Sequence, residues 1–120
     1  MNYNIKGTEV TITPELRNYV EQKLAQADKF LAGDSTAHVD VELQFLGGES
    51  GKKNRAEFTA VAGGESFRAE ERGDSMHEAI DLAATEFTRV VRRTKKREMV
   101  LVRRSGAIIK EMLRGLRDRF

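Results

Sequence analysis

RAEFTAVAGGESFRAEERGDSMHEAID, residues 55–81, contains a β-hairpin signal followed directly by a helix signal. Apolar and polar residues alternate on both sides of Gly63 and Gly64, which is the period of a strand with one buried face. A Gly-Gly pair is typical of a two-residue hairpin turn, because glycine readily adopts the positive φ angles that such turns require. Ser75, with Glu78 three positions later, is typical of a capping box at a helix start. These residues predict two antiparallel strands and then a helix.

The preceding part of the chain predicts two further strands and one helix. Residues 38–45, HVDVELQF, alternate strictly between apolar and polar and predict a strand with one buried face. Before them, Thr13 and Pro14 fit the N-cap and first position of a helix, and apolar residues recur at helical spacing to about Leu31. Residues 2–13 mix β-forming residues with a Gly-Thr pair and predict a first strand followed by a bend.

We therefore predict an α+β fold in the order β-α-β-β-β-α. Short hairpins make the last three strands antiparallel, whereas a right-handed crossover through the first helix makes the first two strands parallel if they are adjacent. The helix that begins at Ser75 keeps one apolar stripe to about Lys95. Because each helix has one apolar stripe, we expect both to pack on one face of a four-stranded sheet and to leave the other face exposed.

A separate segment follows this unit. Residues 107–120, AIIKEMLRGLRDRF, place apolar residues on one helical face and predict a C-terminal amphipathic tail helix. Residues 98–120 are too few to bury a core by themselves. We expect a domain of residues 1–97 and a basic extension of residues 98–120. The extension either orders on a partner, packs on the domain or on a second copy of the chain, or remains mobile.

The composition limits the classes of function. The 120-residue chain has no cysteine, which excludes disulfides, thiolate zinc sites and cysteine nucleophiles, and fits a reducing compartment. The N-terminus lacks the basic and apolar blocks of a signal peptide, and no apolar run approaches the ~20 residues that span a bilayer. We expect a cytoplasmic protein with no membrane partner.

The net charge of +2 conceals a division along the chain. Residues 1–88 contain 9 Lys and Arg against 16 Asp and Glu, whereas residues 89–120 contain 12 against 3. No acid lies between Arg89 and Arg97. Helical spacing places four of these cations opposite the apolar stripe: Arg89, Arg92, Arg93 and Lys96. A merely solvated helix face usually alternates acids with bases, so this face indicates an anionic partner, and a phosphate backbone is the usual one.

Candidate catalytic residues are few. His38 falls on a predicted strand and His77 in the first turn of a helix, and no spacing around either completes a catalytic triad or a metal site. The loop GGESGKK lacks the first glycine of a phosphate-binding loop, has Lys53 at the Ser/Thr position, and precedes a strand. Carboxylates that alternate along the strands fit an ordinary wet sheet face. We expect no enzyme activity, no cofactor, no metal and no small-molecule substrate.

RNA fits the basic face better than DNA does. The second helix begins with the acidic MHEAID, unlike a DNA recognition helix, and Phe58 and Phe67 are expected in the core rather than on an RNA-stacking surface. The mode of binding that the sequence still allows is recognition of the shape and phosphates of structured RNA by the basic helix face.

Two segments resemble a known family. NIKGTEVTITPELRNYVEQKLAQADKF (residues 4–30) and RAEFTAVAGGESFRAEERGDSMHEAIDLAATEFTRVVRRTKKR (residues 55–97) resemble the ribosome hibernation-promoting factors, which include the ribosome-associated inhibitor and were once described as sigma-54 modulation proteins. The resemblance covers about residues 1–97 and implies the same order of strands and helices. It also implies binding to small-subunit ribosomal RNA in the channel and decoding region where messenger and transfer RNA sit, so that translation is sterically blocked and idle ribosomes are preserved.

The resemblance also implies which residues bind RNA. Matched by position, these are Arg17, Lys23, Arg89, Arg93, Lys95 and Arg97. The helical face adds Arg92 and Lys96. Glu86 departs from the family, which usually has lysine there. Long members carry a further domain that pairs ribosomes; this chain is too short to contain it, so we do not transfer that activity. We expect a monomer away from the ribosome.

The basic extension suggests a further RNA anchor. The residues of this hypothesis are Arg103, Arg104, Lys110, Arg114 and Arg117. Two other readings remain open from the sequence: a regulatory protein-binding module of the sigma-factor modulator type, which grips a partner through the apolar tail helix, and a membrane-surface binder that uses the same helix.

Overall fold

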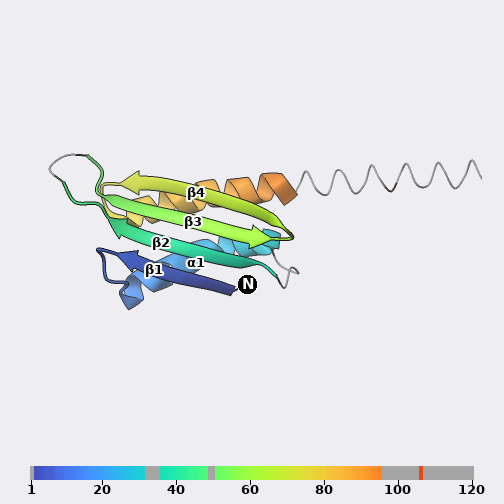
Figure 1. Ribbon diagram of the computed structural model, residues 1–120, viewed down its shortest axis with the longest axis horizontal. Helices are drawn as coiled ribbons and strands as arrows, with labels where there is room; N and C mark the ends of the chain where they lie inside the picture. Colours follow the sequence, from blue (N-terminus) through green and yellow to red (C-terminus); the bar gives the residue numbers. More distant parts are fainter. Residues whose placement is uncertain (1, 32–35, 49–50, 96–105, 107–120) are drawn as a thin grey trace, which may run out of the picture.

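The computed structural model describes residues 2–31, 36–48, 51–95 and 106 (Figure 1). Its elements are β1 (Asn2–Thr8), α1 (Pro14–Leu31), β2 (His38–Phe45), β3 (Asn54–Ala62) and β4 (Glu65–Gly73), followed by a second helix over residues 76–95. The predicted β-α-β-β-β-α order is confirmed. The predicted tail helix and almost all of the 98–120 extension lie outside the described residues.

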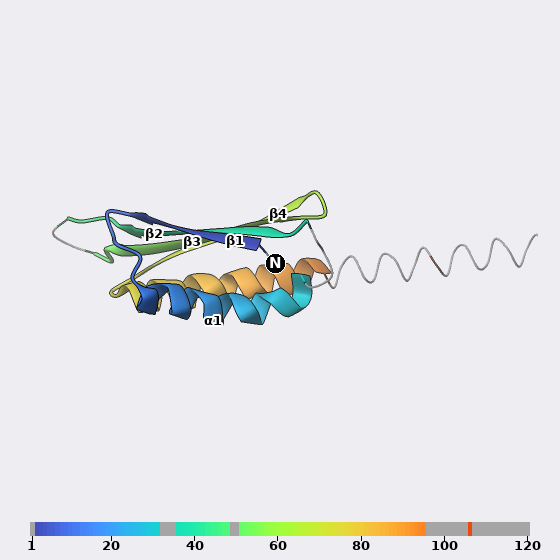
Figure 2. The same cartoon turned by 90° about the horizontal axis from the view of Figure 1, so that it is seen from below.

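The four strands form one sheet in the order β1-β2-β3-β4. β1 runs parallel to β2, and the other neighbours are antiparallel, as predicted. Figure 2 shows α1 and the second helix side by side under one face of the sheet, running in the same direction. Within the described part of the chain, no helix covers the opposite face (Figures 1 and 2). We call this opposite face the open face of the sheet.

Local signals set the element boundaries. Gly63 and Gly64 have φ angles of 59° and 80°, as a two-residue hairpin turn requires. The hydroxyl of Thr13 accepts a hydrogen bond from the backbone N–H of Leu16 at 3.2 Å, which caps α1. The hydroxyl of Ser75 caps the second helix in the same way. The capping box predicted there is only half formed, because the carboxylate of Glu78 instead lies 3.9 Å from Lys52 Nζ.

The core lies between the sheet and the two helices. The inward positions of the strands and the apolar stripes of both helices are buried there. Phe58 of β3 and Phe87 of the second helix stack with ring centroids 5.7 Å apart and are 0% and 1% exposed. Phe67 is also buried, so the expectation that Phe58 and Phe67 face the core is confirmed. Because each helix packs its apolar face on the sheet, the polar faces of the two helices lie side by side on the side away from the sheet.

Candidate nucleic-acid interface

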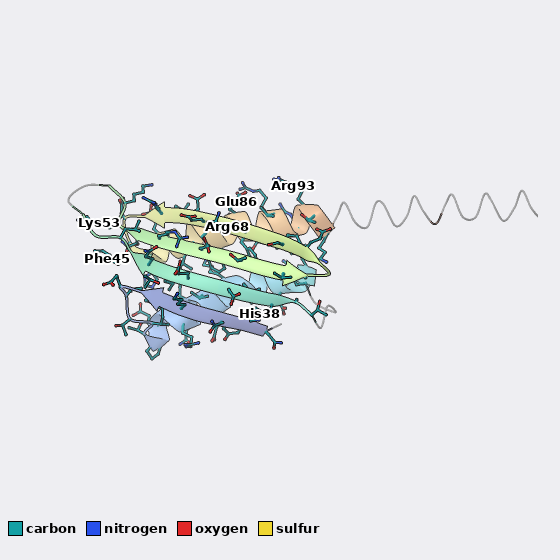
Figure 3. The ribbon with its side chains drawn as sticks, in the orientation of Figure 1. His38, Phe45, Lys53, Arg68, Glu86 and Arg93 are labelled. Carbon is teal, nitrogen blue, oxygen red and sulfur yellow. The ribbon has the colours of Figure 1, made fainter. Side chains whose placement is uncertain are left out.

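The second helix changes sign along its length. Its acids come first, and its described cations follow in the last two turns: Arg89, Arg92, Arg93 and Lys95. Figure 3 shows Glu86 and Arg93 on this helix, with Arg93 nearer its C-terminal end. We call these four cations the basic end of the second helix.

The cations of the basic end differ in their contacts with the rest of the described chain. Arg92 and Arg93 are exposed, and among the described residues neither has an ion-pair partner within 4 Å. Arg89 differs, because its Nη1 donates to the carboxylate of Glu86 at 2.8 Å. The expected acid-free surface is therefore flanked by an acid that pairs with its first arginine. Lys95 is half-buried, whereas Lys96 and Arg97 lie outside the described residues.

Lys23 lies between the two helices, where Asp81 organises a polar cluster. Lys23 Nζ is 2.9 Å from the carboxylate of Asp81, which also accepts a hydrogen bond from the hydroxyl of Tyr19 at 2.6 Å. The hydrogen bonds from Tyr19 and Lys23 lower the pKa of Asp81, and the same contacts raise the pKa of both donors. Asp81 therefore stays ionised, and its charge offsets that of Lys23.

His77 extends this cluster toward the start of α1. Its ring packs edge-on against Tyr19, with centroids 4.6 Å apart, and its Nε2 lies 3.4 Å from the carboxylate of Glu15. These contacts join the N-terminal halves of the two helices. Sequence reasoning placed Tyr19 only in the apolar stripe of α1. The hydroxyl of Tyr19 could have indicated a polar partner, because a tyrosine hydroxyl usually forms a hydrogen bond when its ring is packed.

Arg17 lies on the other flank of α1. The hydrogen bond between Tyr3 and Glu21 raises the pKa of Tyr3, and the positive charge of Arg17 acts in the opposite direction. On a helix, Arg17 and Lys23 are separated by about 120° around the axis. The structure thus brings the cations of the basic end together, places Lys23 beside the same helix nearer its start, and keeps Arg17 apart.

The open face of the sheet carries a compact ion-pair network. Its centre is Arg55 on β3, whose side chain is only 12% exposed. The guanidinium of Arg55 donates to three carboxylates: Glu70 at 2.7 Å, Glu42 at 2.8 Å and Glu57 at 2.6 Å. Arg68, which Figure 3 shows on this face, donates to two of them, Glu57 and Glu70. Sequence reasoning treated these acids as ordinary and did not single out Arg55.

The two surfaces differ in available charge. The bonds from Arg55 lower the pKa of Glu70 and of Glu42 and raise the pKa of Arg55, so the charges of this network remain and satisfy one another. At the basic end, Arg92 and Arg93 have no ion-pair partner among residues 2–31, 36–48 and 51–95.

The described residues show no group of three or more His, Cys, Asp or Glu that could hold a metal ion. None of the described helices is both long and apolar enough to cross a membrane.

Residues 3–99 match the family described as sigma 54 modulation protein / S30EA ribosomal protein, and the chain belongs to this family. Among curated relatives, the ribosome hibernation promotion factor of Bacillus subtilis (strain 168) is 31% identical over 107 residues, which cover 89% of this chain and 55% of the relative. The factor of the same name from Staphylococcus aureus (strain COL) is 31% identical over 99 residues, covering 81% and 50%. The chain spans about half the length of these relatives.

Solved structures show the same fold. The N-terminal domain of Thermus thermophilus Protein Y is 34% identical and superposes with a TM-score of 0.67, over 78% of this chain and 99% of that one. A ribosomal subunit interface protein from Coxiella burnetii, at 18% identity, superposes with a TM-score of 0.63 over 80% and 99%. At that identity the second likeness supports the fold alone.

Proposed function

We propose that this chain is a non-catalytic ribosome hibernation factor that binds small-subunit ribosomal RNA through the basic end of its second helix. The observation that carries the proposal is the exposure of Arg92 and Arg93, neither of which has an ion-pair partner within the part of the chain that the structure describes, on a fold whose curated relatives are named ribosome hibernation promotion factors. Unpaired arginines on a rigid helix are suited to phosphate oxygens, because each guanidinium presents several donors in a fixed plane.

The proposed mechanism is steric. The domain fills the channel and decoding region of the small subunit that messenger and transfer RNA use, so that translation is blocked and the idle ribosome is preserved. The basic end, continued by Lys96 and Arg97, neutralises phosphates and releases their counterions, which drives binding. Lys23 supplies a further contact from α1, and Arg17 meets RNA on the opposite flank of that helix.

The contact is one-sided. On the open face, Arg55 and Arg68 already bind carboxylates, so a phosphate at Arg68 would have to displace Glu57 or Glu70. Arg72 on the same face has no ion-pair partner among the described residues, but it lies beside this acidic network. At the basic end, no such displacement is needed at Arg92 or Arg93. We therefore assign the RNA side to the helices and leave the open face of the sheet directed away from the RNA.

We further propose that residues 1–97 are the ribosome-binding unit and that residues 98–120 add a second RNA anchor through Arg103, Arg104, Lys110, Arg114 and Arg117. In this proposal the protein is a cytoplasmic monomer away from the ribosome. A chain ending at Arg97 should bind small subunits more weakly and with a smaller salt dependence than the full chain. Equal affinity and equal salt dependence would refute the anchor.

The test of the proposed function is co-sedimentation with purified small ribosomal subunits across a salt series. The Arg92→Gln/Arg93→Gln variant removes two cations from the basic end. Arg68→Gln/Arg72→Gln, which removes two from the open face, is its matched control. We expect salt-sensitive binding by the wild type and the control, and weak binding by the helix variant. Binding that survives high salt would instead favour the regulatory protein-binding module, and equal binding by both variants would refute the assigned surface.

A further inference from the structure

Two cations of the proposed RNA-binding surface are already held by carboxylates. Arg89 Nη1 is 2.8 Å from Glu86, one turn earlier on the same helix, and Lys23 Nζ is 2.9 Å from Asp81 across the helix pair. Both carboxylates are partly exposed, with 38% and 44% of the side-chain surface accessible. Each therefore lies where a phosphate approaching its cation would come close to a second negative charge.

We propose that Glu86 is a specificity-determining residue of this surface, which discriminates against flexible RNA in favour of RNA with fixed phosphates. The inference rests on the proposed function and adds to it. Asp81 acts on Lys23 in the same sense, but it also accepts the hydroxyl of Tyr19 and so joins the two helices. Among the described residues, the carboxylate of Glu86 pairs with Arg89 alone, which makes Glu86 the cleaner residue to test.

The first part of the effect is competition. A flexible single strand can follow any set of cations, so its affinity depends mainly on how many phosphates the protein neutralises. With Arg89 paired to Glu86, such a strand finds one cation fewer. One phosphate contact contributes a slope of ~0.7 in log affinity against log salt for single strands, which is about 5-fold in affinity at about 0.1 M salt.

The second part is orientation. An arginine has five N–H donors, and Glu86 accepts from Nη1, so the remaining donors of Arg89 stay available in a preferred direction. The pair spans one helical turn between side chains on a rigid helix. A phosphate fixed in folded RNA at the matching position meets a guanidinium that is already ordered, and this reduces the conformational cost of binding. A flexible strand gains nothing comparable.

Loss of the carboxylate should therefore act differently on the two kinds of RNA. Glu86→Gln frees Arg89 and raises affinity for any polyanion, but it also removes the group that orders Arg89. For folded ribosomal RNA the gain and the loss oppose each other. For a flexible strand only the gain applies. The ratio of the two affinities should fall by up to about 5-fold, the value of one contact.

The experiment measures binding of the full chain to polyuridine and to purified small subunits over the same salt series. Wild type is compared with Glu86→Gln and with Asp40→Asn. Asp40 is a suitable control, because its loss changes the net charge equally but it lies on the open face, 3.0 Å from His38. We expect Glu86→Gln to bind polyuridine several-fold more tightly than Asp40→Asn does, with a salt slope steeper by ~0.7, and to bind small subunits with little change.

Two results would overturn the inference. Glu86→Gln and Asp40→Asn could behave alike on polyuridine, which would make the effect one of net charge. Glu86→Gln could also raise both affinities by the same factor, which would show that Glu86 weakens binding without discriminating. Failure of the proposed function is distinguishable, because in that case wild-type protein would not bind small subunits at all.

Discussion

Replacing Arg55 by methionine should destabilise the domain by about 2 kcal/mol at neutral pH. Methionine keeps much of the length of the side chain but removes the charge that three carboxylates share. The change leaves Glu42, Glu57 and Glu70 on neighbouring strands with no central cation. Like charges that face each other across a sheet destabilise it, and Arg68 can offset only part of this repulsion.

The magnitude follows from the burial of the group. Breaking a fully buried ion pair by removing one partner costs about 3–5 kcal/mol, whereas an exposed pair contributes about 0–1 kcal/mol. The side chain of Arg55 is 12% exposed and its three partners are 21–30% exposed, so the network falls between these limits. Arg68→Met is the matched control, because its side chain is 59% exposed and its loss should cost well under half as much.

The effect should depend on pH. Arg55 lowers the pKa of Glu70 and of Glu42, so the stability that these carboxylates contribute is complete above their unfolded value of about 4.3. That stability is lost as pH falls through their lower folded values. In the variant, protonation instead relieves repulsion. The wild type and Arg55→Met should therefore converge in acid.

Urea denaturation followed by circular dichroism, at about pH 7 and about pH 3, measures both free energies of unfolding. The reasoning would be wrong if Arg55→Met cost no more than Arg68→Met at neutral pH, or if the deficit of Arg55→Met stayed constant into acid. Binding of Arg55→Met to small subunits should match that of the wild type when both are folded, because the open face does not contact RNA in our proposal.

Three further predictions concern the helices. Arg92→Gln/Arg93→Gln should lower the slope of log affinity against log salt for small subunits by ~1.4–1.8, the value of two phosphate contacts, and an unchanged slope in filter binding would exclude both arginines from the interface. Tyr19→Phe should lower the free energy of unfolding, measured by urea denaturation, by about 1 kcal/mol, because Asp81 loses a hydrogen-bond donor that lowers its pKa. The full loss is expected at pH values above the ordinary pKa of aspartate, and it should shrink as pH falls below that value. Phe87→Ala should cost about 3–5 kcal/mol by the same assay, since the ring is 1% exposed and stacks on Phe58; a cost below about 1 kcal/mol would contradict this packing.

Most of the fold could be predicted because its signals are local. The turn at Gly63 and Gly64 and the caps at Thr13 and Ser75 each depend on residues a few positions apart. Strict alternation and helical periodicity then assign the buried faces, and connection rules restrict the topology. The predicted capping box forms only in part, because the carboxylate of Glu78 lies near Lys52 of the β2–β3 loop and not at the backbone N–H of Ser75.

The candidate site was harder to predict because its charges are arranged by distant contacts. Asp81 and Tyr19 are 62 positions apart, and no local pattern reveals that they meet. The Arg55 network joins residues of three strands, so it requires the sheet register. The pair between Glu86 and Arg89 is different. It is a local i,i+3 contact and could have been predicted, but the basic stretch begins at Arg89 and Glu86 lies three residues before it.

Directed cleavage of ribosomal RNA from the two faces of the protein tests the central claim most directly. Because the chain has no cysteine, a single cysteine can carry an iron chelate that cleaves nearby RNA. Thr85→Cys places it on the exposed side of the second helix, and Ser66→Cys places it on the open face of the sheet. We predict cuts from position 85 in small-subunit RNA that lines the channel for messenger and transfer RNA, and far weaker cuts from position 66. Cuts mainly from position 66, or none in the small subunit from either position, would contradict the account.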